Sequence, residues 1–352
     1  MPPISNDNLL PRPPYDPELY AAMPLFPSTP AMDPAAIAAY RAELTTMIAP
    51  VKEAILADPF VKHYTRTIPG GGSGAGAPIE LHVFSPAAVD VMAGPVSGMA
   101  DGGGGRSRPC IVNFHGGGFM SGDAFLGMGT MAEYVRALGA VVVSPAYRRA
   151  PEHPHPAPAE DCYAALKWVA ANGKRELGVD AERRLMVAGE SAGGGLAAAV
   201  ALMARDDVDA GRPRLCAQLL VCPMLDDRND SVSCRQYARG DAWDAKRNEF
   251  GWKCLLGDEA GGEGVSYYAA PTRATDLSGL PPTFIDVGSA EPFRDENVAY
   301  ASKLWECGVD AELHVWPGGT HAFHTFVPTA AISEVSNQTR MEWVRRVLER
   351  VV

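Results

Sequence analysis

The chain lacks the features that mark membrane, secreted and nucleic-acid-binding proteins. Its 352 residues contain no run of about 18 apolar residues, so no membrane-spanning helix is expected. The N-terminus has no basic segment followed by an apolar one, which is the pattern of a secretory signal. The net charge of −11 argues against nucleic acid or an anionic membrane surface as a partner. We therefore expect a soluble, cytoplasmic protein.

Cysteine is scarce and irregularly placed. The chain has 7 cysteines and no C-x-x-C pair, which argues against a zinc ribbon or a disulfide framework. Several lie in apolar runs, as Cys222 does after Leu219–Val221. We expect buried, reduced thiols. The hydrophobic share of 47% and charged share of 21% are ordinary for a globular protein, and the length suits one large α/β domain or two smaller ones.

The N-terminal segment is rich in proline over residues 1–33, which predicts an extended arm and not a folded element. Apolar residues then recur with helical spacing over 34–56, and Pro50 is expected to break or restart that helix. Such a helix could dock on the core or form a mobile lid over a pocket. Residues 86–108 include four consecutive glycines and predict a flexible loop without assigned function.

Strands and helices alternate through most of the remaining chain. Residues 79–84 alternate apolar and polar, which predicts a half-exposed antiparallel strand. Buried strands are then predicted at 110–114, 141–143, 185–188, 215–221, 283–287 and 311–316, with helices at about 124–138, 158–172, 192–203, 293–307 and 332–350. This order predicts a mainly parallel sheet covered on both faces by helices. Residues 224–280 interrupt it without a clear strand and predict a cap or a pocket wall.

The stretch around Ser191 carries the strongest chemical signal. Gly189-Glu190-Ser191-Ala192-Gly193 joins the strand 185–188 to a helix rich in small residues. A serine in this context can occupy a sharp, strained turn, because the flanking glycines remove the Cβ atoms that would crowd it. The N–H groups at the start of the helix then face the serine oxygen, where negative charge would develop.

Other strand ends carry residues that complement this serine. His115-Gly116-Gly117-Gly118 follows one strand, and consecutive glycines let backbone N–H groups turn toward a substrate. Glu291 and Asp295 follow a second strand, and His321 follows a third. In an open parallel sheet these carboxyl ends meet at one edge, and serine, acid, histidine is the chain order of an α/β-hydrolase triad.

On these residues the chain resembles the hormone-sensitive-lipase-like branch of the α/β-hydrolases. Five motifs occur in the order of that family: His115–Phe119, Tyr147–His153, Gly189–Gly194, Glu291–Glu296 and Pro317–Phe323. The resemblance implies an α/β-hydrolase fold with eight strands, the second antiparallel, and a helical cap. Residues 1–60 would supply the arm and cap helices, and 61–352 the catalytic domain, with 224–280 as the cap or pocket-wall insertion.

The resemblance and the chemistry of the side chains assign the same roles. Ser191 is the expected nucleophile and His321 its general base. Glu291 matches the acid position of the family, although aspartate is the usual residue there. Asp295 is the rival acid, and Asp286 a weaker one because it lies within the strand. The oxyanion hole is expected from the N–H groups of Gly117, Gly118 and Ala192, the last of which follows the nucleophile.

The other histidines are expected to have structural roles. His115 should hold its loop, and His153 and His155 have metal-like spacing but fall in a proline-rich loop. His314 and His324 are second choices for the base, and Glu190 could perturb the nucleophile beside it. No metal or cofactor is implied.

We therefore expect a serine carboxylesterase that acts on small-molecule esters, with short acyl chains favoured by the resemblance. An amidase or formamidase with the same triad, or a non-catalytic binding protein of hydrolase fold, are the alternatives. The sequence leaves the oligomeric state open, a homodimer included.

Overall fold

The computed structural model describes residues 10–23, 36–71, 76–87, 107–239 and 243–350. Most of the predicted glycine-rich loop 86–108 lies outside these residues, as do 1–9 and 24–33 of the predicted arm. Within the described part of the chain, no helix has both the length and the apolar composition needed to cross a bilayer. All of the cysteines lie in this part, and each is a free thiol.

An eight-stranded sheet forms the centre of the molecule, in the order β1-β2-β4-β3-β5-β6-β7-β8. Strand β2 pairs antiparallel with both β1 and β4, and the other pairs are parallel. The strands are β1 (Val61–Ile68), β2 (Ile79–Pro86), β3 (Cys110–Phe114), β4 (Val141–Pro145), β5 (Leu185–Glu190), β6 (Ala217–Val221), β7 (Thr283–Gly288) and β8 (Ala311–Trp316). The predicted α/β fold, including the antiparallel second strand, is confirmed.

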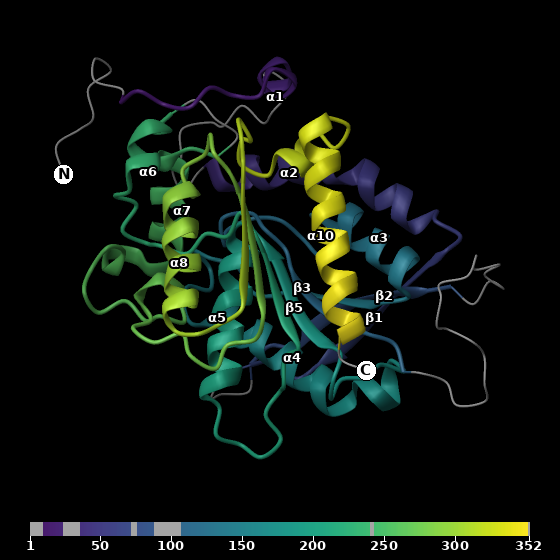
Figure 1. Ribbon diagram of the computed structural model, residues 1–352. Helices are drawn as coiled ribbons and strands as arrows, with labels where there is room; N and C mark the ends of the chain where they lie inside the picture. The colour runs from purple at the N-terminus through teal and green to yellow at the C-terminus, as the bar shows by residue number, and fades with distance from the viewer. Residues whose placement is uncertain (1–9, 24–35, 72–75, 88–106, 240–242, 351–352) are drawn as a thin grey trace.

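Helices cover both faces of this sheet (Figure 1). Helices α3 and α10 contact each other on one face, and α4, α5 and α8 lie on the other. Their bounds are α3 (Met128–Leu138), α4 (Ala157–Glu176), α5 (Ala192–Asp206), α8 (Arg294–Glu306) and α10 (Ala331–Arg350), with the one-turn α9 (Phe323–Phe326) before α10. The central strands β3 and β5 are therefore buried on both sides, as their continuous apolar runs predicted.

The proline-rich arm is not wholly extended, contrary to prediction. Residues Pro17–Ala22 form the short helix α1, whose first N–H groups donate to the Asp16 carboxylate. An aspartate N-cap followed by proline at the first helical position is a helix-start signal. The arm is anchored because the Asp16 N–H donates to the Gly318 carbonyl at 2.9 Å and Leu19 is fully buried beside Phe323.

Helix α2 (Ala36–Leu56) runs through Pro50 without a break, so the predicted interruption is wrong. Proline removes the hydrogen bond that would reach the carbonyl of Thr46. Both Pro50 and Thr46 lie on the exposed face of α2, where water can satisfy that carbonyl, while Leu44 and Ile48 hold the opposite face against the core.

The segment 224–280 contains no strand in its described residues, as predicted. It forms α6 (Val232–Gln236), α7 (Ala245–Leu256) and two 3-10 turns, Gly257–Glu259 and Pro271–Arg273. Trp243 and Trp252 from this segment are both buried.

Candidate active site

Ser191 lies at a strained turn between β5 and α5. Its backbone has φ 59° and ψ −123°, a combination that non-glycine residues rarely adopt. The turn is possible because its flanking residues are glycines. A Cβ at Gly189 would lie 2.1 Å from the Gly193 carbonyl oxygen, and one at Gly193 would lie 2.0 Å from the Phe114 carbonyl oxygen. The elbow geometry that the sequence predicted is present.

The structure brings Ser191, His321 and Glu291 into one hydrogen-bonded chain. His321 Nε2 lies 2.9 Å from Ser191 Oγ, and His321 Nδ1 lies 2.5 Å from Glu291 Oε2. All three side chains are buried, with Ser191 6% exposed. The other carboxylate oxygen of Glu291 accepts the Gly288 N–H at 2.8 Å, which fixes the carboxylate in the plane it needs to face the imidazole.

The two rival acids have other partners. Asp295 accepts hydrogen bonds from the Ser233 N–H and from Arg294 Nε, both at 2.8 Å. Asp286 forms a fully buried ion pair with Arg340 of α10 at 2.8 Å and also accepts Trp316 Nε1. Asp295 thus binds α6 to the start of α8, and Asp286 binds α10 to the sheet. Of the three acids, Glu291 is the one in hydrogen-bond contact with His321.

The glycine loop after β3 has the backbone of an anion-binding turn. Gly117 and Gly118 have φ values of 111° and 60°, and a Cβ on Gly117 would approach the Ser121 carbonyl oxygen to 2.4 Å. Among the described residues, the N–H groups of these two glycines have no hydrogen-bond acceptor. The N–H of Ala192 is also free of intrahelical partners, because it begins α5.

Helix α2 is bonded to the end of this loop through Arg41. Arg41 donates from Nε to the Met120 carbonyl at 2.7 Å and from its terminal nitrogens to the Ala150 carbonyl and the Glu152 carboxylate. The contact fixes α2 against both the glycine loop and the predicted Tyr147–His153 motif. The sequence did not indicate Arg41, because nothing in a helical periodicity tells which distant loop a polar residue will meet.

His115 has the structural role that the sequence predicted. Its ring stacks on Tyr147 at 4.2 Å between centroids, and its Nδ1 lies 2.8 Å from the Gly116 carbonyl oxygen. Burial lowers the pKa of His115 to about 4. The imidazole is therefore neutral in the native protein at neutral pH.

We predict that His115 makes the native state sensitive to acid. Because its native pKa lies below the unfolded value of about 6.5, the unfolded state binds more protons, and stability falls as pH decreases from that value toward 4. The loss attributable to this one group should be about 2 kcal/mol between pH 7 and pH 5. Urea unfolding at both pH values measures it. The His115→Asn variant should show a shallower pH dependence, and an unchanged dependence would contradict the assignment.

Glu190 and His324 form a second carboxylate–imidazole pair beside the nucleophile, in which His324 is buried and Glu190 is partly buried. Glu190 Oε2 lies 3.0 Å from His324 Nε2 and accepts the Thr325 hydroxyl at 2.9 Å. This pair occupies His324, so it is not placed as a base for Ser191. His314, the other second choice, lies in β8 with Nε2 3.0 Å from Glu312. His155 is half-buried, and its backbone N–H donates to the Leu255 carbonyl.

Two aromatic side chains flank His321. The Phe293 ring is perpendicular to the imidazole, with 4.9 Å between the ring centroids. The centroid of the Trp243 ring lies 6.3 Å from that of the imidazole. Trp243 also packs directly against the glycine loop, since a Cβ at Gly118 would lie 2.3 Å from Cη2 of Trp243. The sequence marked the segment that contains Trp243 as a pocket wall, but it did not single out the contact with Gly118.

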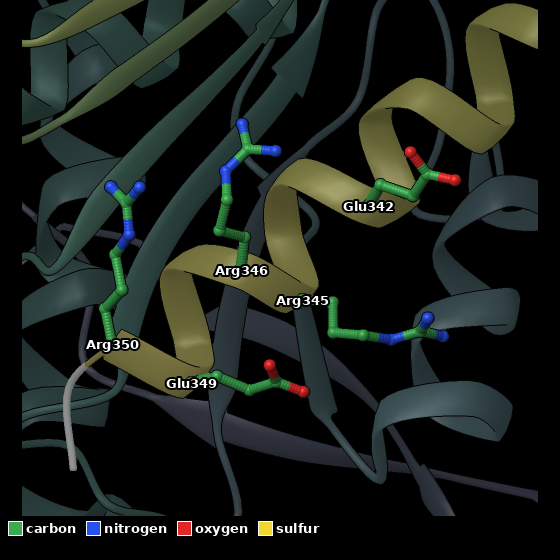
Figure 2. A pocket seen from close by; sticks show the side chains of 5 residues that line it. All are labelled: Glu342, Arg345, Arg346, Glu349 and Arg350. Carbon is green, nitrogen blue, oxygen red and sulfur yellow. The ribbon is translucent and has the colours of Figure 1, made fainter.

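The described residues also line hollows outside this cluster. One has a volume of about 780 Å³ and lies between α2, α3 and the loop after His321, with a mainly apolar lining that includes Ile48, Phe125 and Met341. Another is a charged hollow of about 400 Å³ at the end of α10 (Figure 2). There Arg346 pairs with Glu312 of β8, and Arg346 and Arg350 extend from the same side of the helix, as a solvated charged face does.

Comparison with known proteins places this fold and sequence in a family. The sequence profile of the α/β-hydrolase fold matches residues 111–325. Esterase LipI of Mycobacterium tuberculosis (strain ATCC 25618 / H37Rv) is 39% identical over 206 residues, which are 58% of this chain and 62% of LipI. Carboxylesterase NlhH of the same organism is 38% identical over 232 residues, 63% of this chain and 70% of NlhH. A solved structure described as a bacterial heroin esterase superposes with a TM-score of 0.81 at 37% identity, covering 95% of this chain and 98% of that chain.

The chain therefore belongs to the α/β-hydrolase family. The predicted resemblance to its hormone-sensitive-lipase-like esterases is confirmed.

Proposed function

We propose that this protein is a serine carboxylesterase that hydrolyses esters of small molecules. The observation that carries the proposal is the continuous chain from Ser191 Oγ through His321 to Glu291, with spacings of 2.9 and 2.5 Å. The esterase names of its relatives support the same class.

In the proposed reaction His321 Nε2 removes the proton of Ser191 as Oγ attacks the ester carbonyl. Glu291 keeps the Nδ1–H tautomer of His321 in place and stabilises the imidazolium that forms. The imidazolium then gives its proton to the departing alcohol, which leaves an acyl group on Ser191. Water activated by His321 attacks this acyl-enzyme and releases the carboxylic acid.

The proposed oxyanion hole consists of the N–H groups of Gly117, Gly118 and Ala192. These N–H groups come from two segments: the glycine loop after β3, and the start of α5, which directly follows Ser191. Each such donor is worth about 2.7–4 kcal/mol of transition-state stabilisation in comparable sites. The Ser121 hydroxyl donates to the Gly117 carbonyl, and Arg41 donates to the Met120 carbonyl. These bonds keep the N–H donors of the loop oriented before substrate binds.

We also propose that α1, α2 and the segment 224–280 form a cap over the catalytic domain 61–352. The contacts of Arg41 with Met120, of Asp16 with Gly318 and of Trp243 with Gly118 support this division, because each joins a cap element to a loop of the site. Trp243 fills space beside the glycine loop and His321, so we expect it to restrict the enzyme to short acyl chains.

Replacing Trp243 by alanine should therefore move the acyl preference toward longer chains. Removal of the indole opens room beside His321 for several methylene groups, each worth about 0.8 kcal/mol when buried. Rates with p-nitrophenyl esters from acetate to decanoate measure the shift. Trp305→Ala serves as a matched control, because Trp305 is half-exposed on α8. An unchanged chain-length profile in Trp243→Ala would remove this residue from the pocket.

The same ester series tests the proposed function as a whole. We expect the native protein to hydrolyse the short esters and to act much more slowly on the matching p-nitroanilides, because an anilide has a poorer leaving group. Turnover of the anilides in preference to the esters would favour the amidase alternative. Binding of esters without turnover would favour a non-catalytic binding protein.

A further inference from the structure

A cysteine thiol lies beside two members of the triad, Glu291 and His321. Cys222 directly follows β6 and is 3% exposed. One ligand atom from each of Cys222, Glu291 and His321 falls within 4.8 Å of the other two, and all three side chains are buried. The three residues come from separate segments of the chain, so the fold and not local sequence assembles them.

The backbone holds this thiol in a fixed position. Cys222 has φ 35°, in the left-handed region that a non-glycine residue rarely occupies. Its N–H donates to the Asp286 carbonyl at 2.7 Å, and the backbone of Ala322 lies beside its sulfur. Ala322 is the residue after His321, so the thiol lies against the loop that carries the imidazole.

We propose that Cys222, Glu291 and His321 form a binding site for a thiophilic divalent cation such as Zn²⁺ or Cd²⁺, and that the bound cation switches the hydrolase off. The inhibitory part rests on the proposed function. Thiolate, imidazole and carboxylate are the ligand types of zinc sites, and three protein ligands leave a fourth position for water. Zinc lies about 2.0–2.3 Å from such ligand atoms. The three side chains can therefore surround one ion if their ligand atoms move by about 1 Å or less.

The chemistry of binding explains the inhibition. The cation forms bonds to the sulfur, to a carboxylate oxygen and to His321 Nδ1. The thiol proton is released to solvent, and the neutral imidazole, which binds the metal through Nδ1, carries its one proton on Nε2. The carboxylate of Glu291 is then engaged by the metal. His321 loses the Nδ1–H···carboxylate contact that orients it, and its Nε2, which now carries the proton, cannot accept the proton of Ser191.

The surrounding negative charges attract a divalent cation. The carboxylates of Glu291, Glu190 and Asp286 lie close enough to Cys222 to act on it electrostatically. Their other neighbours are His324, which pairs with Glu190, and Arg340, which pairs with Asp286, so of these acids Glu291 is the one that shares the cluster with the thiol.

Titration of the full-length protein with Cd²⁺ tests the site by two readouts. The first is the ultraviolet charge-transfer absorption of a cadmium–thiolate bond, which needs no turnover. The second is inhibition of p-nitrophenyl ester hydrolysis, taken relative to the metal-free rate of each variant. Native protein should bind Cd²⁺ and lose activity in parallel, with EDTA restoring it. Cys222→Ser should weaken inhibition at least about tenfold and abolish the corresponding absorption.

A matched variant separates this site from other thiols. Cys254, in α7, is less buried than Cys222 and also free, so Cys254→Ser should keep the cadmium response of the native protein. Equal responses in native protein and Cys222→Ser, or no response in native protein, would overturn the proposal. If Cys222→Ser misfolds, Cys222→Ala replaces it. A cadmium–thiolate band that depends on Cys222 in a protein without esterase activity would keep the metal site and reject the proposed function.

Discussion

Replacing Ser191 by alanine should lower kcat for p-nitrophenyl acetate by about 10⁵- to 10⁶-fold, with little change in KM. The substitution removes the atom that forms the acyl-enzyme and leaves the proposed oxyanion donors in place. The residual rate should therefore still exceed that of the uncatalysed reaction. Steady-state kinetics on purified native and variant protein measure both constants.

Folding of the variant is the necessary control. Alanine adopts the φ of 59° at position 191 about as poorly as serine does, so the native elbow should persist, and thermal unfolding should show similar midpoints. Ser302→Ala is the matched substitution, since the Ser302 hydroxyl donates to the Val298 carbonyl one turn earlier in α8, away from the site. A Ser191→Ala protein that is folded and fully active would show that another residue is the nucleophile.

Replacing Glu291 by glutamine should lower kcat by about 10⁴-fold while replacing Asp295 by asparagine should leave it within a few-fold of native. Glutamine keeps the size of the side chain but loses the charge that stabilises the imidazolium. Its amide can also present N–H to His321 Nδ1 and so favour the wrong tautomer. Asp295 instead bonds to Ser233 and Arg294, away from the imidazole.

The pair of variants decides which acid serves His321. Measurement of kcat against pH for both proteins, with a folded-state check by circular dichroism, distinguishes loss of the base from loss of structure. A large loss in Asp295→Asn together with near-native activity in Glu291→Gln would reverse the assignment. Comparable losses in both would mean that the loop 288–295 acts as a structural unit and that geometry in the resting state does not identify the acid.

The buried strands of the sheet could be predicted from the sequence because they are continuous apolar runs. Strand β1 was missed because it lacks such a run. It lies at the edge of the sheet, and among its residues only Val61 and Ile68 are buried, so the run Val61–Ile68 has neither a buried pattern nor strict alternation. Its β-branched and aromatic residues were the available signal.

The part of the candidate site that lies at strand ends and in glycine-rich turns could be predicted from the sequence. Ser191, His321 and the glycine loop follow strands whose carboxyl ends must meet at one edge of a parallel sheet. The choice between Glu291 and Asp295 was not determined by spacing, because both follow β7 closely, Glu291 in the loop after Gly288 and Asp295 at the start of α8. Their orientations depend on which partners the surrounding loops supply, here Gly288 for Glu291 and Ser233 for Asp295.

The contacts that hold the site in place come from distant segments and left no sequence pattern. Arg41 meets the Met120 carbonyl across 79 positions, and Trp243 packs on Gly118. Cys222 lies beside Glu291 and His321 because β6 and β7 are neighbours in the sheet. Periodicity identifies which face of an element is buried, but tertiary packing decides what that face meets.

Reaction with a serine-directed phosphonate ester tests the central claim most directly. We expect one phosphonyl group per chain, bound to the peptide that contains Ser191, with activity lost in proportion to labelling. Peptide mass spectrometry locates the group, and the labelling rate should fall sharply in both Ser191→Ala and His321→Ala. Stoichiometric labelling of another serine, or full activity after Ser191 is labelled, would contradict the account.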